Sequence, residues 1–133
     1  MIVADASALI ELLLGGARGR AVEDHLMGEA DDVQVPALLD VEVAQVLRRL
    51  VLLGMVDEGR ARASLEILAD MPLHRHLVHA LLPRIWQLRD NLTAYDAAYV
   101  ALSEALGCPL LTFDERIAGA PGHTAEVVVP GSP

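Results

Sequence analysis

The sequence predicts an α/β protein with three layers, in which helices cover both faces of a mostly parallel central sheet. Short apolar segments alternate along the chain with longer segments of helical periodicity, the order expected of strand–helix–strand units. Of the 133 residues, 53% are hydrophobic but only 3% are aromatic. The core must therefore consist of aliphatic side chains, which suits helices packed on a parallel sheet. No repeat or linker divides the chain, and residues 1–133 are expected to form a single domain.

Five short segments have the apolar or alternating character of strands. They cover residues 2–4, 33–36, 73–77, 109–112 and 126–129, the last within a Pro/Gly-rich stretch of residues 118–133. Helical spacing of apolar residues lies between them, at residues 7–14, 18–29, 38–53, 58–70, 78–90 and 94–106. Asp57 and Thr93 are expected to cap the helices that follow them, and Gly54 and Gly107 to end the helices before them.

The charge of the chain limits how it can meet nucleic acid. The formal net charge is −9, and lysine is absent, so every strong cation is an arginine. A protein that binds nucleic acid over a broad surface carries a basic face, so any such contact here must use a few local arginines. Cys108 is the only cysteine, which excludes an internal disulfide, and its apolar neighbours favour a buried thiol over a nucleophile.

The N-terminal residues and the apolar segments bear on the cellular localisation of the protein. No basic segment precedes Asp5, and no apolar run reaches the ~20 residues of a membrane span. We therefore expect a cytoplasmic protein with neither a signal peptide nor a membrane segment.

Two aspartates stand where strands of the predicted sheet end. Asp5 directly follows the first strand, and Asp114 lies just beyond the fourth. Ligands of open parallel sheets bind at the carboxyl ends of the strands, so both carboxylates are expected on one rim. Each also precedes a helical segment and can act as its N-cap, a role that is compatible with a site.

Asp96 and Glu42 are the further candidates. Asp96 follows Thr93 by three residues, the spacing of a capping box, in the first turn of the helix that leads into the fourth strand. Glu42 lies on the shoulder of an apolar helix face, where a carboxylate is costly unless it is paired or coordinated. Capping for Asp96 and a solvated surface position for Glu42 are the alternatives.

Four carboxylates brought together would repel one another. Each pair costs roughly 4 kcal/mol at ~4 Å in an effective dielectric of 20, and the chain has no lysine to neutralise them. A divalent cation would relieve this repulsion, and a set of oxygen ligands selects Mg²⁺ or Mn²⁺ over zinc. The conjunction of the four acids therefore predicts a metal site.

Four segments resemble those of the PIN-domain family, specifically the VapC-type toxins of bacterial toxin–antitoxin pairs. They are residues 2–7 (IVADAS), 35–49, 92–102 (LTAYDAAYVAL) and 110–116 (LLTFDER). The resemblance implies an α/β/α fold, homodimers and a cognate antitoxin that blocks the site. It gives acidic roles to Asp5, Glu42, Asp96 and Asp114, with Ser7 and Thr112 as polar neighbours. Gln45 stands where many relatives have asparagine, so the auxiliary role of that position stays open.

The function expected from this resemblance is Mg²⁺-dependent hydrolysis of RNA phosphodiesters, with Mn²⁺ as a substitute ion. Asp5 and Asp96 are the first candidates for direct ligands. Asp114 and Glu42 would bind a second ion, hold water or accept a proton. Five arginines are candidates for RNA contact or, alternatively, for solvated or ion-paired surface positions: Arg48, Arg49, Arg84, Arg89 and Arg116.

Other classes fit the sequence less well. A receiver domain and a P-loop protein both need a lysine that the chain lacks, and a haloacid-dehalogenase-type phosphatase needs Asp-x-Asp where the chain has Asp5-Ala6-Ser7. His74, His76 and His79 lie close together in sequence without a matching acid or cysteine, so we expect surface histidines there. The remaining alternative is a catalytically silent PIN-like module that binds RNA or a protein.

Overall fold

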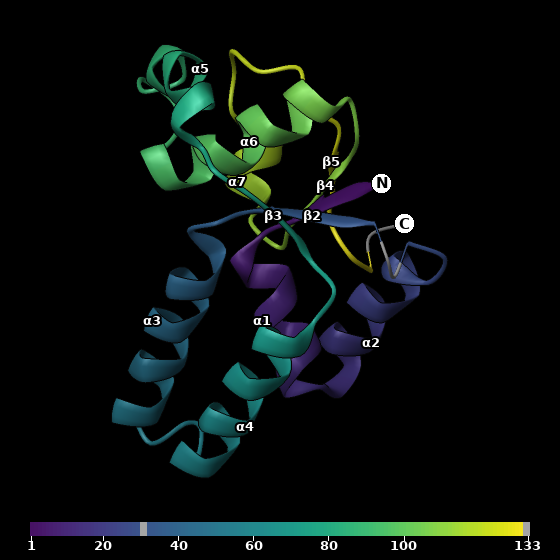
Figure 1. Ribbon diagram of the computed structural model, residues 1–133, viewed down its shortest axis with the longest axis vertical. Helices are drawn as coiled ribbons and strands as arrows, with labels where there is room; N and C mark the ends of the chain where they lie inside the picture. The colour runs from purple at the N-terminus through teal and green to yellow at the C-terminus, as the bar shows by residue number, and fades with distance from the viewer. Residues whose placement is uncertain (30–31, 132–133) are drawn as a thin grey trace.

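The computed structural model describes residues 1–29 and 32–131 (Figure 1). Its elements follow the order β1 (Ile2–Ala4), α1 (Ala6–Leu14), α2 (Gly16–Leu26), β2 (Val33–Pro36), α3 (Leu39–Leu52), α4 (Glu58–Asp70), β3 (His74–His76), the 3₁₀ helix η1 (His79–Leu81), α5 (Leu82–Gln87), α6 (Ala94–Leu106), β4 (Leu110–Leu111), α7 (Glu115–Gly119) and β5 (Val127–Val128). Strands and helices thus alternate as the sequence predicts.

The five strands form one sheet in the order β3-β2-β1-β4-β5. Every neighbouring pair is parallel, and β1 lies in the middle, with Val3 opposite Gln34 of β2 and Leu110 of β4. Helices α1 to α4 cover one face of the sheet, and α5 and α6 cover the other (Figure 1). This arrangement confirms the predicted three-layer fold and brings the carboxyl ends of β1 and β4 side by side.

The core is aliphatic, as the composition predicts. Its largest fully buried side chains are mostly leucines and valines of the strands and of the helix faces that meet the sheet, such as Leu9, Val43 and Leu110. Tyr99 of α6 is the exception, an aromatic residue only 2% exposed. Cys108 is also buried. Within the described ranges, no helix combines the length and the apolar character needed to cross a bilayer.

Helix ends follow the predicted signals, with one main difference. Asp57 accepts a hydrogen bond from the amide of Gly59 at 3.0 Å, and Gly107 ends α6 in the left-handed region at φ 63°. The single helix expected over residues 78–90 is instead split into η1 and the short α5. Pro83 stands in the first turn of α5, where its missing N–H and fixed φ are tolerated, whereas inside a longer helix it would break the hydrogen-bond ladder.

Gly19 of α2 allows the first two helices to pack closely. A Cβ at this position would lie 2.5 Å from the backbone oxygen of Glu11 in α1, closer than real Cβ contacts. Helix α1 follows β1 directly, so the contact at Gly19 also fixes how α2 lies relative to the end of the central strand.

We predict that Gly19→Ala lowers the free energy of unfolding by about 1–3 kcal/mol, because the added methyl group meets backbone that cannot move independently. Gly119→Ala in α7 is the matched control, since a Cβ there meets nothing within 4 Å. Urea unfolding of both variants checks the difference. Equal stability of the two proteins would contradict the close packing of α1 and α2.

Candidate active site

Asp5 is held by three elements at the centre of the sheet. It follows β1, its own amide donates to the carbonyl of Leu111 in β4 at 3.1 Å, and its Oδ1 accepts from the amide of Ala8 at 3.1 Å as the N-cap of α1. Its side chain also accepts hydrogen bonds from Ser7 Oγ at 2.6 Å and from Thr112 Oγ1. Only 6% of the residue is exposed. Asp5 therefore both caps α1 and presents a fixed carboxylate at the strand end.

Ser7 and Thr112, the two predicted polar neighbours, connect Asp5 to the segment that carries Asp114. Ser7 Oγ accepts from the amide of Phe113 at 3.0 Å, and Thr112 Oγ1 accepts from the amide of Asp114 at 2.9 Å. These hydroxyls bridge the ends of β1 and β4. The loop after β4 is consequently fixed in place relative to Asp5.

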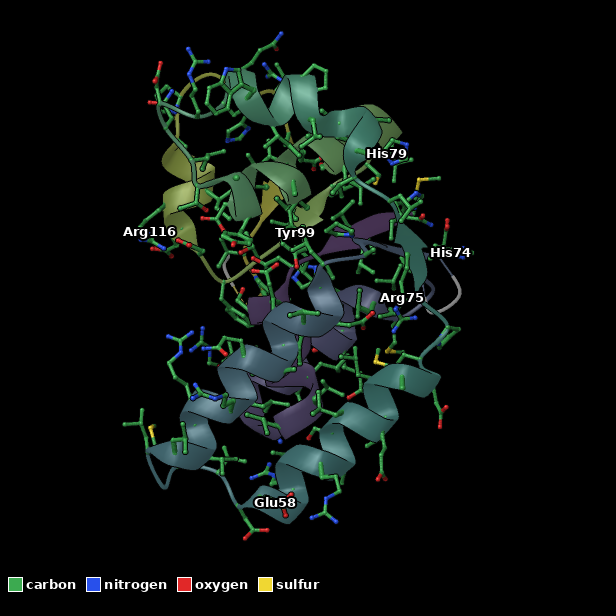
Figure 2. The ribbon with its side chains drawn as sticks, turned by 60° about the vertical axis from the view of Figure 1, so that its left-hand side comes forward. Glu58, His74, Arg75, His79, Tyr99 and Arg116 are labelled. Carbon is green, nitrogen blue, oxygen red and sulfur yellow. The ribbon has the colours of Figure 1, made fainter. Side chains whose placement is uncertain are left out.

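Glu42 reaches the site from the first turn of α3 and has a partner that the sequence analysis did not select. The hydroxyl of Tyr99 donates to Glu42 Oε1 at 2.7 Å, and Figure 2 shows Tyr99 near the start of α3. A signal was present, because Tyr99 follows Asp96 by three residues and so shares its helix face. The hydroxyl holds a half-buried carboxylate that would otherwise lack a described hydrogen bond.

Asp96 and Asp114 occupy two helix starts on the same rim. Asp96 is half-buried in the first turn of α6, and its amide donates to the capping oxygen of Thr93 at 3.1 Å. Asp114 caps α7, and its carboxylate accepts from Arg116 Nε at 3.0 Å and from a terminal nitrogen at 2.7 Å. Asp114 is thus the N-cap of α7, and Thr93 caps the helix that carries Asp96.

Charge repulsion acts between pairs of the four candidate acids. Burial is the largest cause that raises the pKa of Asp5, Glu42 and Asp96, and repulsion adds to it: Asp96 acts on Asp5, both act on Glu42, and Asp114 acts on Asp96. The Arg116 guanidinium instead holds the pKa of the Asp114 carboxyl below its usual range. Residues distant in sequence therefore lie close enough to feel each other's charge.

The donors of this cluster are all carboxylate and hydroxyl oxygens, which fit a hard divalent cation such as Mg²⁺ or Mn²⁺. Across the two described ranges, no three acidic, histidine or cysteine side chains already stand close enough to hold an ion. The four acids do not form a closed ligand set, and a cation bound among them would reduce the mutual repulsion that contributes to the raised pKa values of Asp5, Glu42 and Asp96.

The histidines expected at the surface are not part of this group. His74 and His79 are exposed, and His76 Nε2 lies 2.6 Å from Gln34 Oε1. Gln34 is a buried residue of β2, so His76 satisfies a polar group at the edge of the sheet.

Two of the five candidate arginines lie beside the carboxylates. Arg49 lines a cavity of about 470 Å³ together with Glu42, Gln45 and Tyr95, and Arg116 pairs with Asp114. Gln45, whose role the sequence left open, thus borders the acid that precedes it on α3.

The other three arginines are placed elsewhere. Arg84 binds Glu104 with two contacts of 2.9 Å, Arg89 stacks on Trp86 at 4.9 Å, and Arg48 lines a groove that includes Glu58 of α4. Sequence reasoning could not separate these groups, because an arginine's partner depends on tertiary contacts.

Comparison with known proteins identifies the family of the chain. The model of the PIN domain family matches residues 2–122. The chain belongs to the PIN-domain family. It is 40% identical over 127 residues to ribonuclease VapC12 of Mycobacterium tuberculosis, covering 96% of this chain and 97% of the relative. It is 43% identical over 127 residues to ribonuclease VapC1 of the same organism, covering 94% of each.

The fold is shared with chains of known structure. A toxin–antitoxin complex from Klebsiella pneumoniae contains a chain with a TM-score of 0.67 and 21% identity, with 100% of both chains covered. At this identity the likeness concerns the fold. The resemblance on which the sequence analysis relied is therefore confirmed for the family.

We predict that Tyr99→Phe lowers the free energy of unfolding by about 1–3 kcal/mol at pH 7, because Glu42 loses a donor in a half-buried position. Tyr95→Phe is the matched control, since the exposed Tyr95 has no hydrogen bond to any described residue. A double-mutant cycle with Glu42→Ala should recover most of the Tyr99 effect as coupling energy. Additive effects of the two substitutions would exclude the interaction.

Arg84→Gln should destabilise the fold by about 1–2 kcal/mol at pH 7, because Glu104 loses a bidentate partner. Arg84 lowers the pKa of Glu104 from 4.5 to about 2, so the stabilisation is complete above pH 4.5 and is lost as the pH falls toward 2. Urea unfolding between pH 7 and pH 3 should show that the difference in the free energy of unfolding between wild type and Arg84→Gln becomes smaller as the pH falls. Arg62→Gln, which breaks an exposed pair, should change the free energy of unfolding much less than Arg84→Gln does.

Proposed function

We propose that this PIN-domain protein is a Mg²⁺-dependent endoribonuclease that acts as the toxin of a toxin–antitoxin pair, with Mn²⁺ as a substitute ion. The observation that carries the proposal is the buried Asp5 carboxylate at the end of β1, which the hydroxyls of Ser7 and Thr112 connect to the loop that carries Asp114. Glu42 and Asp96 lie close enough for their charges to act on each other and on Asp5. Relatives at 40% and 43% identity over almost the whole chain are named ribonucleases, which supports RNA as the substrate.

Asp5 and Asp96 are the first candidates to hold the ion. The buried Asp5 carboxylate is fixed by three hydrogen-bond donors, and the charge of Asp96 acts on it. A divalent ion there would neutralise the phosphate and lower the pKa of water for attack on phosphorus. Glu42 is oriented by Tyr99 and has a pKa raised by burial, and a raised pKa makes a carboxylate a better proton acceptor.

Asp114 differs from the other three acids because it is already paired: Arg116 donates hydrogen bonds to both of its carboxylate oxygens. Arg116 is highly exposed and also acts electrostatically with Asp96. In the proposed reaction, Arg116 leaves Asp114 to contact a phosphate of the RNA, and the released carboxylate completes the cluster. This gives Arg116 the RNA-contact role that its position in the sequence suggested.

An antitoxin and a second copy of the chain are the proposed protein partners. The structural neighbour from Klebsiella pneumoniae is a toxin–antitoxin complex, which supports a protein inhibitor for this chain as well. The net charge of −9 favours an antitoxin segment with basic residues. The homodimer follows from the family resemblance, and sedimentation velocity of the purified protein tests it.

We predict that the wild-type protein cleaves RNA only with Mg²⁺ or Mn²⁺, and that Asp5→Asn lowers the rate by about 100-fold or more. Asparagine keeps the capping ability of the aspartate, so circular dichroism should show an intact fold. Asp70→Asn, at the exposed end of α4, is the control and should cleave like wild type. Equal cleavage by the Asp5 variant would refute the assignment. No cleavage with either ion would favour a silent binding module.

A further inference from the structure

A cation and an aromatic ring are stacked directly beside the carboxylate cluster. The guanidinium of Arg18 in α2 lies 4.1 Å from the centre of the Phe113 ring. Phe113 immediately precedes Asp114, and its amide donates to the same Ser7 hydroxyl that donates to Asp5. The backbone of Phe113 is therefore connected to Asp5 through the Ser7 hydroxyl, and its ring provides the surface on which Arg18 stacks.

The two contacts of Arg18 leave its guanidinium available to bind a further group. Its side chain is 60% exposed, and its one ion pair, with Glu11, spans 3.4 Å and is itself solvent-accessible. An exposed pair of this kind is weak. Stacking orients the planar guanidinium while leaving its N–H groups available, which is the geometry that arginine uses to bind phosphate.

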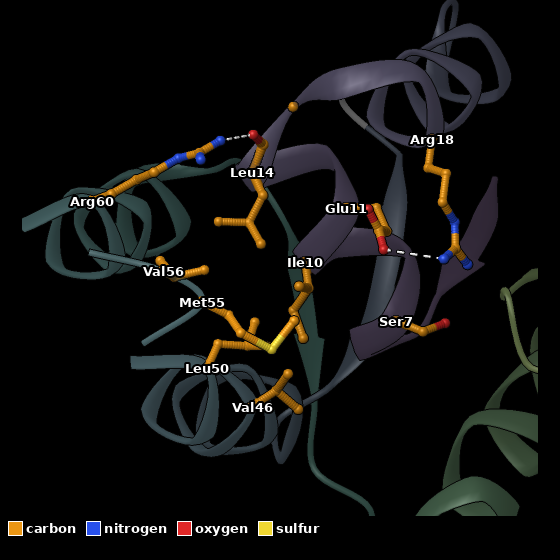
Figure 3. Close-up of a pocket in the computed structure, with 11 residues that line it drawn as sticks. Ser7, Ile10, Glu11, Leu14, Arg18, Val46, Leu50, Met55, Val56 and Arg60 are labelled. Atoms are coloured by element: carbon orange, nitrogen blue, oxygen red, sulfur yellow. Dashed lines mark hydrogen bonds and ion pairs between the residues drawn. The ribbon is translucent and has the colours of Figure 1, made fainter. Parts of the chain in front are cut away.

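The surroundings of Arg18 connect it to the reacting centre. Ser7 and Arg18 line the same cavity of about 620 Å³. Figure 3 shows Ser7, Glu11 and Arg18 at one end of it, and aliphatic side chains such as Leu50 and Val56 at the other. The polar end thus starts at a hydroxyl bonded to Asp5 and continues to a guanidinium.

The charge of the protein makes a cation at this place necessary for RNA. The carboxylates repel a polyphosphate chain, and there is no lysine to attract it. Arg116 is paired with Asp114, and Arg49 lies on the Glu42 side of the site. Two arginines line the cavity that begins at Ser7. Arg60 lies at its far end, where it donates to the backbone oxygen of Leu14, whereas Arg18 lies at the same end as Ser7 (Figure 3).

We propose that Arg18, supported by Phe113, forms a subsite for a backbone phosphate of the RNA next to the phosphate that is cleaved. The inference rests on the proposed ribonuclease function and adds a binding position to it. Arg18 holds the neighbouring phosphate and so positions the scissile one over Asp5. Phe113 contributes by fixing the plane of the guanidinium.

RNA binding by a variant that cannot cleave tests the subsite separately from catalysis. Fluorescence anisotropy of a labelled single-stranded RNA is measured against Asp5→Asn protein in Mg²⁺, with and without Arg18→Gln. We expect Arg18→Gln to weaken binding about five- to tenfold and to reduce the slope of log K against log salt by about 0.7, the value for one phosphate contact on a single strand.

Two further variants separate charge from stacking. Arg20→Gln is the matched control, because Arg20 is an exposed residue of the same helix with no interaction among the described residues; it should bind RNA like the parent. Arg18→Lys keeps the charge without the planar fork and should bind with intermediate affinity. Phe113→Leu should also weaken binding, since Arg18 loses its support.

Cleavage kinetics of the otherwise wild-type protein give the second readout. Arg18→Gln should raise KM while kcat changes little, because the contact is made in the bound ground state as well as during reaction. The proposal is overturned if Arg18→Gln and Arg20→Gln proteins bind RNA equally with the same salt slope. It is also overturned if Arg18→Gln weakens only binding of a protein partner. Cleavage by wild type with unchanged RNA binding by Arg18→Gln would refute the subsite and leave the ribonuclease function intact.

Discussion

The fixed burial of the Asp5 carboxylate is the constraint on which the rest of the site depends. A carboxylate only 6% exposed needs compensating donors, and here they come from α1 and from the end of β4. The requirement to satisfy one buried charge therefore holds the central strand, the first helix and the loop of Asp114 in a single arrangement. The same carboxylate caps α1 and stands at the carboxyl end of the central strand.

Around Asp5, the protein keeps several negative charges close together in a fold that is already acidic. Burial and mutual repulsion raise the pKa values of Asp5, Glu42 and Asp96, whereas Asp114 is compensated by Arg116. Such a cluster is unfavourable for folding and is retained where charge is to be neutralised by a ligand. Negative charge concentrated at this rim attracts cations and repels polyanions, so the few arginines near it are the groups that can offset it.

The arginines show what cannot be read from a sequence. Arg84 and Arg116 look alike in the chain, yet one holds α5 and α6 together through Glu104 and the other faces the carboxylates. Arg18 was not selected from the sequence, because the residues next to it in the chain do not indicate that the distant Phe113 packs against it. Tyr99 was recognisable as part of a family segment, but its hydrogen bond to Glu42 depends on where α3 and α6 cross.

The sequence by itself determined the order of strands and helices, the aliphatic core, the capping residues and the position of each candidate acid at a strand end or in a first helical turn. Periodicity, helix caps and strand-end positions are local properties of the chain. It misjudged the helix around Pro83, where one local restriction outweighed the apolar spacing. Only the tertiary structure decided which charges meet. Pairings such as Tyr99 with Glu42 and Arg18 with Phe113 join residues from different elements, and their energy depends on distances that exist only after the layers have packed.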